Sequence, residues 1–304
     1  MKKVFITGSE GMLGSKLVEH HLQQEDFVIS SDVLPCHYLT EHRKHIQEDI
    51  RNIDINTLPG EIDIVYHFAG LPCPSHYLDR PIETVELTVG TAKATLDLAR
   101  RCNATYVLAS SSEVYGDPKE IPQREEYTGS IETTHPRSVY SEAKRLCETL
   151  TMAHHHEYGL DTKIARIFNS YGKFLDGDTR IIPAFFKALT ERTPIKIFGD
   201  GEQKRSYCFV DDTIEGILKL ADSHCHSPIN IGNYNEFYSV KEIANILMDA
   251  TNMRVPIIYE ENSNMIGAIN RRPSIQKAKE ILNWKPFTDF YTGISKIKGL
   301  YILK

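Results

Sequence analysis

The chain has 304 residues, of which 41% are hydrophobic and 25% charged, a composition that excludes intrinsic disorder, collagen-like repeats and small disulfide-rich folds. A net charge of −6 argues against nucleic acid as a partner, and the absence of a long apolar run argues against a membrane span. The length fits one large domain or two unequal ones that share a core.

The first half of the chain alternates strand-like and helix-like segments. Apolar strands are predicted at 3–7, 27–32, 62–67, 104–109 and 162–167, and helices at 12–24, 82–101 and 138–158. Strands that alternate with helices need crossover connections, which place the strands parallel in one sheet. The sequence therefore predicts an α/β fold with a Rossmann-type, doubly wound parallel sheet.

The pattern becomes less regular after about residue 172. A short strand is predicted at 195–198, and helices near 181–191, 211–222 and 239–251. The acidic pair Asp211-Asp212 is interpreted as the N-cap of one of these helices. We expect residues 1–172 to form the Rossmann domain, with a return segment near 206–235. Residues 173–304 would form mainly a smaller C-terminal, substrate-binding cap.

A glycine-rich loop joins the first strand to the first helix. Its glycines, Gly8, Gly11 and Gly14, follow a variant of the spacing found in dinucleotide-binding loops. Gly8 would make the tight turn, Gly11 would let the backbone approach a pyrophosphate, and Gly14 would allow close packing of the helix on the strand. An ordinary strand-to-helix turn is the alternative. Asp32 ends the next strand, where its carboxylate can accept hydrogen bonds from both hydroxyls of the adenosine ribose and would repel a 2′-phosphate. The sequence therefore predicts NAD as the cofactor rather than NADP.

Other residues around this loop are candidates for cofactor binding. Met12 and Leu13 lie within the glycine motif. Asp49 and Ile50 stand where such folds hold the adenine edge, although an exposed loop aspartate is nearly as good an interpretation. Ala69 follows a strand, in a run of small residues that would let the cofactor pass.

A tyrosine and a lysine, Tyr140 and Lys144, lie four residues apart on one helix face. A nearby ammonium lowers the pKa of a phenol, and the phenolate can then act as a base toward a sugar hydroxyl. The pair alone could be a solvated polar face. It follows a strand that ends in Ser111, Ser112 and Glu113, which is the arrangement of short-chain dehydrogenase chemistry.

These residues belong to a set of segments that together resemble those of a known protein family. The segments are 72–77, 111–118, 121–123, 136–140, 165–172, 199–206 and 271–275. Over essentially its whole length the chain resembles the extended short-chain dehydrogenase/reductases, or NAD-dependent epimerase/dehydratase family. Within that family it is most similar to the UDP-glucuronate decarboxylases, or UDP-xylose synthases. The resemblance implies an NAD-dependent lyase or isomerase that binds a nucleotide sugar mainly through its cap.

The resemblance also implies a role for each catalytic candidate. Tyr140 would be the base on the sugar 4-hydroxyl while the C4 hydride goes to NAD, and Lys144 would hold the nicotinamide ribose and lower the Tyr140 pKa. Ser111 would bond the sugar 4-oxygen, and Glu113 would sit near C5. The resulting β-keto acid would lose carbon dioxide, and the bound cofactor would then reduce the product.

Substrate-binding roles follow in the same way. Asn169 and Arg205 would contact the diphosphate, Arg180 the nucleotide side, and Arg271 the region of the sugar carboxylate. Ser112 occupies a substrate-facing position where dehydratases carry an aspartic acid, and a serine is a poor proton donor.

The identity of the sugar is the open question. Arg271 and Arg272 are two cations that could hold a hexuronate carboxylate, whereas Glu86 replaces a lysine of the family and would repel it. We favour UDP-glucuronate on this balance. The alternatives are a 4-epimerase, 4-dehydrogenase or dehydratase acting on a neutral or amino sugar, and more remotely a non-catalytic NAD-binding protein.

The six cysteines show no paired spacing and are interpreted as reduced thiols of a cytoplasmic protein without a signal peptide. The run His154-His155-His156 suggests a metal, but consecutive helical side chains diverge, so no metal site is predicted. The family resemblance suggests a homodimer that forms through the helices at 82–101 and 138–158.

Overall fold

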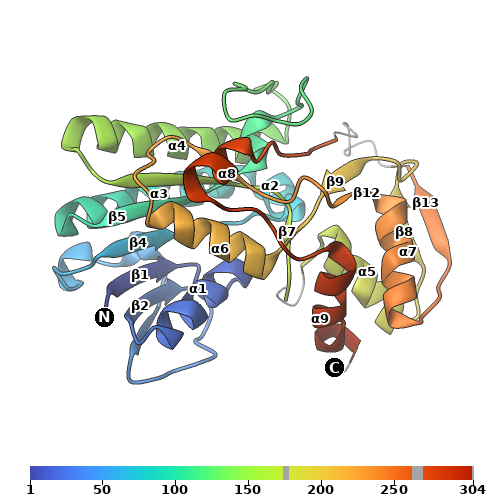
Figure 1. The fold of residues 1–304 in the computed structure, drawn as a ribbon, viewed down its shortest axis with the longest axis horizontal. Coiled ribbons are helices and arrows are strands. Elements are labelled where there is room, and N and C mark those ends of the chain that lie inside the picture. The colour runs from blue at the N-terminus through green and yellow to red at the C-terminus, as the bar shows by residue number, and fades with distance from the viewer. Residues whose placement is uncertain (174–177, 262–269, 303–304) are drawn as a thin grey trace.

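The computed structural model describes residues 1–173, 178–261 and 270–302. Its centre is a seven-stranded sheet whose strands are all parallel, in the order β11-β6-β5-β4-β1-β2-β3 (Figure 1). The strands are β1 (Lys3–Thr7), β2 (Phe27–Asp32), β3 (Arg43–Gln47), β4 (Ile64–His67), β5 (Thr105–Ser111), β6 (Thr162–Ile167) and β11 (Ile229–Ile231). The predicted α/β class with a Rossmann-type sheet is confirmed.

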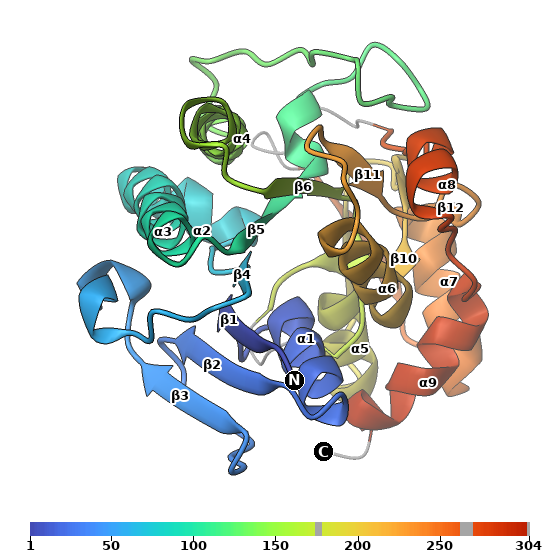
Figure 2. The same ribbon diagram turned by 60° about the vertical axis from the view of Figure 1, so that its left-hand side comes forward.

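Helices cover both faces of this sheet. The helices of the chain are α1 (Met12–Gln23), α2 (Pro74–Asp79), α3 (Pro81–Cys102), α4 (Ser138–Tyr158), α5 (Ile181–Thr190), α6 (Val210–Ala221), α7 (Val240–Thr251), α8 (Gln276–Leu282) and α9 (Phe290–Ile302), with 3-10 turns η1 (Ile50–Asn52), η2 (Ile55–Thr57) and η3 (Ser112–Tyr115). Figure 2 shows α3 and α4 on one face, and α1 and α6 on the other. Val4 and Ile6 pack in the α1–α6 core, whereas Phe5 between them packs in the α3–α4 core, as alternation along a strand requires.

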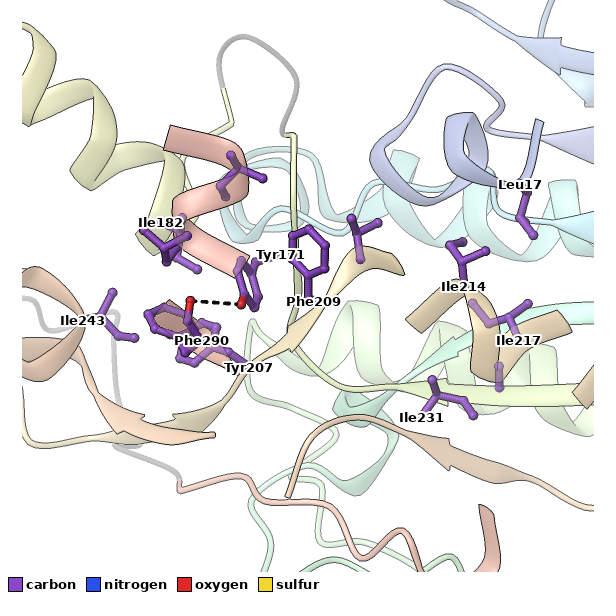
Figure 3. Close-up of a cluster of buried hydrophobic side chains, with 14 of the residues drawn as sticks. Leu17, Tyr171, Ile182, Tyr207, Phe209, Ile214, Ile217, Ile231, Ile243 and Phe290 are labelled. Carbon is purple, nitrogen blue, oxygen red and sulfur yellow. Dashed lines mark hydrogen bonds between the residues drawn. The ribbon is translucent and has the colours of Figure 1, made fainter. Parts of the chain in front are cut away.

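The second half of the chain builds a smaller lobe from α5, α7, α9 and short strand pairs. The pairs are β8 (Ile195–Phe198) with β13 (Ile257–Glu260), β9 (Lys204–Ser206) with β12 (Phe237–Ser239), and β7 (Ser170–Tyr171) with β10 (Cys208–Phe209). One buried cluster runs from α1 and α6 into this lobe, where Tyr171, Tyr207, Phe209 and Phe290 meet (Figure 3). The Tyr171 hydroxyl donates to the Phe290 carbonyl at 3.3 Å. The two lobes therefore share one continuous core.

Two sequence-based interpretations were wrong or incomplete. Strand β3 was missed, because its sequence, Arg-Lys-His-Ile-Gln, has little apolar character at the edge of the sheet. Asp212 is not an N-cap. It is buried in the first turn of α6 and accepts hydrogen bonds from the Phe287 amide and from the amide and hydroxyl of Thr288, so it anchors the segment before α9.

The six cysteines are all free: Cys73, Cys147 and Cys208 are buried, and Cys36, Cys102 and Cys225 half-buried. None of the helices in the described ranges is both long enough and apolar enough to cross a membrane.

Candidate active site

A cavity of about 560 Å³ opens at the carboxyl ends of β1, β4 and β5. The strand order reverses between β1 and β4, and ligands of doubly wound sheets bind outside the strand ends at such a point. Most of the candidate residues line this cavity: Gly8, Gly11, Met12, Leu13, Gly14, Asp32, Asp49, Ile50, Ala69, Ser111, Ser112, Glu113, Tyr140, Lys144, Asn169 and Arg180. Residues that are up to 172 positions apart in the chain thus meet at one site.

The glycine-rich loop forms one wall of the cavity and admits little but glycine. Gly8 has a φ of +67°, and a Cβ built on it would lie 2.6 Å from the Phe68 carbonyl oxygen. A Cβ on Gly14 would lie 2.0 Å from the Gly8 carbonyl oxygen. Gly11 is the N-cap of α1, so free amides at the start of this helix face the cavity. Backbone this close to the cavity fits the pyrophosphate of a dinucleotide.

Two acidic residues, Asp32 and Asp49, line the cavity beside the glycine-rich loop. Asp32 is held by backbone amides, since its two oxygens accept from Glu10 at 2.9 Å and Leu34 at 3.0 Å. Asp49 is the N-cap of η1 and is paired with Arg51 at 2.6 Å. Burial raises the pKa of Asp49, but Arg51 lowers it further, so the balance lies below its usual value. Asp32 is therefore the more available acid for a ribose.

A buried pair that the sequence did not reveal joins two of the strand ends. The Thr7 hydroxyl accepts from the amides of Phe68 and Ala69, both at 3.1 Å, and lies 3.2 Å from Nδ1 of His67. Burial, together with the charge of Lys144, lowers the pKa of His67 to about 3. A neutral His67 is thus hydrogen-bonded to Thr7, and Thr7 fixes the loop at Phe68 and Ala69, which line the cavity.

Tyr140 is buried on the first turn of α4, and its ring stacks on that of Tyr77 at 5.5 Å. Burial and the charge of Glu113 raise the pKa of Tyr140, while a hydrogen bond from Ser111 and the charge of Arg180 lower it. Ser111 ends β5, and its hydroxyl also accepts the Glu113 amide at 3.2 Å. The predicted serine and tyrosine are therefore brought together.

Lys144 lies one helical turn beyond Tyr140, and its ammonium is 5.8 Å from the Tyr140 ring. It donates to the Ala109 carbonyl at 2.8 Å, and burial lowers the pKa of Lys144. Ser111 and Arg180 are the groups with the largest lowering effect on the pKa of Tyr140, while Lys144 is bonded to β5. The effect of Lys144 on this pKa stays a prediction.

A buried network behind the site, also missed from the sequence, holds α4 against β5 and β6. The Ser110 hydroxyl donates to Glu148 at 2.5 Å, and the Arg166 guanidinium donates to both Glu148 oxygens. Arg166 also donates to the hydroxyl of Tyr115 at 3.0 Å. Because Glu148 follows Lys144 by one turn and Ser110 precedes Ser111, this network fixes the two elements that carry the serine and the lysine.

Glu113 and Arg271 form an ion pair at the far end of the cavity. Arg271 is almost fully buried, and it also donates to the Gly116 carbonyl at 3.1 Å. Burial raises the pKa of Glu113, but Arg271, Arg137 and Arg205 outweigh it, so this carboxyl has a pKa below its usual range. Glu113 lines the cavity, whereas Arg137, Arg205 and Arg271 are not among its lining residues.

These arginines create an excess of positive charge around one carboxylate. Burial and repulsion by Arg271 lower the pKa of Arg205 to about 10. Arg205 donates to the Lys204 carbonyl, and Arg137 donates to the Tyr77 hydroxyl at 3.5 Å. Arg137 was not among the predicted site residues, although it stands only three positions before Tyr140. Anions other than Glu113 would be stabilised here.

The remaining candidates flank the cavity. Ser112 is buried at the start of η3, and the Asn169 amide donates to the Ser206 carbonyl at 3.2 Å. Arg180 is the N-cap of α5 and is paired with Asp178 at 2.5 Å.

Arg272 and Glu86, which were expected to attract and to repel the sugar carboxylate, do not line the cavity. The Arg272 guanidinium donates to the Tyr234 carbonyl at 2.7 Å and lies over the Phe237 ring, so it is turned toward β12. Glu86 is exposed, and its charge acts on Arg51 rather than on the cavity, into which α3 directs Leu87 instead. The expectation that Arg271 and Arg272 together hold the sugar carboxylate is therefore wrong. The expectation that Glu86 repels this carboxylate is wrong as well.

Comparison with known proteins agrees with this geometry. The family model described as the NAD dependent epimerase/dehydratase family matches residues 4–232. The chain belongs to the NAD-dependent epimerase/dehydratase family. NAD is accordingly its cofactor, and the glycine loop, Asp32 and the cavity fit that molecule.

Among curated members of the family, UDP-glucuronic acid decarboxylase 2 of Arabidopsis thaliana is 34% identical over 96% of this chain and 66% of its own length. UDP-glucuronic acid decarboxylase 6 of the same plant is 35% identical over 96% of this chain and 86% of its own length. The chain thus spans about two thirds of the length of several of these relatives.

Solved structures of family members share the fold. An epimerase from Methanothermobacter thermautotrophicus has a TM-score of 0.90 with 25% identity, over 98% of this chain and 91% of that one. A UDP-glucuronic acid 4-epimerase from Bacillus cereus, solved with UDP-glucuronic acid and NAD, has a TM-score of 0.88 with 24% identity, over 99% of both chains.

Proposed function

We propose that this member of the epimerase/dehydratase family is a UDP-glucuronate decarboxylase that works through a 4-keto sugar. The observation that carries the proposal is the cluster of Arg137, Arg205 and Arg271 around Glu113, next to Tyr140. A neutral nucleotide sugar would offer these three cations only its diphosphate, whereas a hexuronate adds a carboxylate. The decarboxylases to which the chain is 34–35% identical support the same substrate.

The chemistry begins at the 4-hydroxyl of the sugar. Tyr140 takes the hydroxyl proton, Ser111 holds the oxygen through its hydroxyl, and Lys144 stabilises the phenolate and the cofactor ribose. NAD, when bound, supplies a reversible acceptor for the C4 hydride. The resulting β-keto acid loses carbon dioxide readily, and Arg271 would orient its carboxylate near Glu113. The enolate that remains takes a proton from water at C5. The hydride then returns to C4 while Tyr140 gives its proton back to the 4-oxygen.

The other candidates would hold the nucleotide. We assign Asn169 and Arg205 to the diphosphate, Arg180 to the nucleotide side and Ser112 to the sugar. Ser112 also argues against a dehydratase, because an uncharged hydroxyl is too weak an acid to protonate a leaving hydroxide.

Incubation with UDP-glucuronate, followed by mass spectrometry, tests the proposal against its rivals. We expect a UDP-pentose and an equal amount of carbon dioxide, and no turnover of UDP-glucose or UDP-N-acetylglucosamine. Formation of an isomeric UDP-hexuronate would instead indicate a 4-epimerase, and oxidation of a neutral sugar nucleotide would exclude the decarboxylase.

We expect NAD to bind in preference to NADP, and Asp32→Asn to reduce that preference. The substitution keeps the shape of the side chain but removes the anion that repels a 2′-phosphate. Isothermal titration of cofactor-free protein with both cofactors measures the effect. Equal affinities in the unaltered protein would contradict this role of Asp32.

We also propose a homodimer that forms through α3 and α4, which lie side by side and expose Ile82, Val85 and Leu146 (Figure 2). The free cysteines are compatible with a cytoplasmic location. Residues 1–172 with the return segment would bind NAD, and residues 173–304 mainly the nucleotide sugar. Light scattering of the purified protein would reveal the dimer, and a monomer at micromolar concentration would contradict it.

A further inference from the structure

A buried ion pair lies directly beneath the glycine-rich loop. It joins Glu10, in the loop itself, to Arg43 at the start of β3, and both side chains are only 3% exposed. Arg43 also donates to the Ser30 hydroxyl at 3.1 Å and the Tyr38 carbonyl at 2.9 Å. Burial raises the pKa of Glu10, but the His37 amide and Arg43 lower it further, so the pKa lies below its usual value. Both partners are therefore charged in the folded protein.

The backbone and side chain of Glu10 also contact both Asp32 and the segment that follows β2. Its amide donates to Asp32 at 2.9 Å, and its second carboxylate oxygen accepts the amide of His37 at 3.1 Å. One residue thus contacts both Asp32 and the segment between β2 and β3 that borders the cofactor cavity. Loss of its charge would release Arg43 without removing Asp32.

A metal site is a weaker interpretation of the same cluster. Glu10, Cys36 and His45 have ligand atoms within 4.8 Å of one another. However, the His45 nitrogens already contact the Ser30 hydroxyl and the Leu34 carbonyl, and Cys36 donates to the Tyr38 carbonyl. A cation bound to Glu10 would also face the Arg43 guanidinium at contact distance. The ion pair satisfies the carboxylate without a metal.

An arginine close to the acid that follows β2 is the group by which dinucleotide-binding folds accommodate a 2′-phosphate. Arg43 does not line the cofactor cavity, but it contacts the Ser30 hydroxyl, two residues before Asp32 on β2. It is paired with Glu10, whose amide donates to Asp32. Glu10 neutralises Arg43 and holds it there. We infer that Glu10 is a second determinant of selectivity for NAD over NADP, acting through Arg43 and alongside Asp32. The inference rests on the proposed role of Asp32 as the acid that reads the ribose.

Cofactor titration of Glu10→Gln tests this inference directly. With Arg43 released, the ratio of NAD affinity to NADP affinity should fall roughly tenfold, the effect of one new charge-assisted contact to phosphate. Isothermal titration of cofactor-free protein gives the two affinities without any assay of turnover. A negative result here would therefore leave the decarboxylase proposal intact, and a failed decarboxylase assay would leave this inference intact.

The matched control is Glu10→Gln combined with Arg43→Met, which removes both buried charges and leaves no cation for the phosphate. Its affinity ratio should return to within about twofold of the unaltered protein, because Asp32 remains. Glu10→Ala provides a second release of Arg43, should the glutamine variant not fold. An unchanged ratio in the single variants, an equal loss of both cofactors, or the same fall in the double variant would each overturn the inference.

Discussion

Replacing Tyr140 by phenylalanine is expected to lower the turnover of UDP-glucuronate by roughly 10²–10⁴-fold, the usual contribution of a positioned general base. The hydroxyl that would accept the sugar proton is lost, whereas the ring can still stack on Tyr77. NAD should bind nearly as before, since the glycine loop and Asp32 are untouched. Steady-state kinetics together with cofactor titration measure the two effects separately.

The pH dependence identifies the base. Burial raises the pKa of Tyr140, and only the ionised phenol accepts a proton, so turnover of the unaltered enzyme should rise with pH. The phenylalanine variant should lose this rise. Tyr158 is an exposed tyrosine at the other end of α4. Tyr158→Phe is therefore the matched control and should retain both the turnover rate and its pH profile. Normal turnover by Tyr140→Phe would show that another group is the base.

Arg271→Met is expected to abolish decarboxylation and to destabilise the fold. The variant leaves the partly buried Glu113 without its main counter-charge, and breaking a buried pair costs about 3–5 kcal/mol. The Glu113 side chain is 23% exposed to solvent, so we expect a loss of folding stability at the lower end of that range. Denaturant unfolding and carbon dioxide release measure the two consequences.

Two further variants separate charge from packing. Glu113→Gln combined with Arg271→Met removes both charges and should recover much of the lost stability, though not the activity. Arg272→Met removes the neighbouring arginine, which is turned toward Tyr234, and should leave substrate affinity unchanged. An equal loss of activity in Arg272→Met would contradict a specific role for Arg271.

The sign of the pH effect follows from the same pair. The arginines hold the pKa of Glu113 below its unfolded value, so the stability from pairing is present above the usual glutamate range and is lost as the pH falls through the native value. In Arg271→Met the pKa of Glu113 rises. The stability gap between the two proteins should thus be widest at neutral pH and should narrow in acid.

Much of the fold and the cofactor site was predictable because it is encoded locally. Gly8, Gly11 and Gly14 are fixed by one turn, Asp32 by the end of one strand, and Tyr140 and Lys144 by one helix face. Such features need only short-range geometry. Strand β3 escaped prediction because an edge strand buries little and can be charged.

The substrate end depended on contacts between distant segments. Glu113 and Arg271 are separated by 158 positions, and Ser110 and Glu148 by 38. Sequence alone could not show that Arg272 turns away while Arg271 turns inward, although they are adjacent. The outward direction of Glu86 likewise depends on how α3 packs.

Turnover of UDP-glucuronate that carries deuterium at C4 tests the central claim most directly. A site in which Tyr140 and bound NAD oxidise and then restore C4 predicts a UDP-pentose that has lost the carboxylate and kept the deuterium on the same carbon. A UDP-hexuronate product, or a pentose without deuterium, would contradict the account.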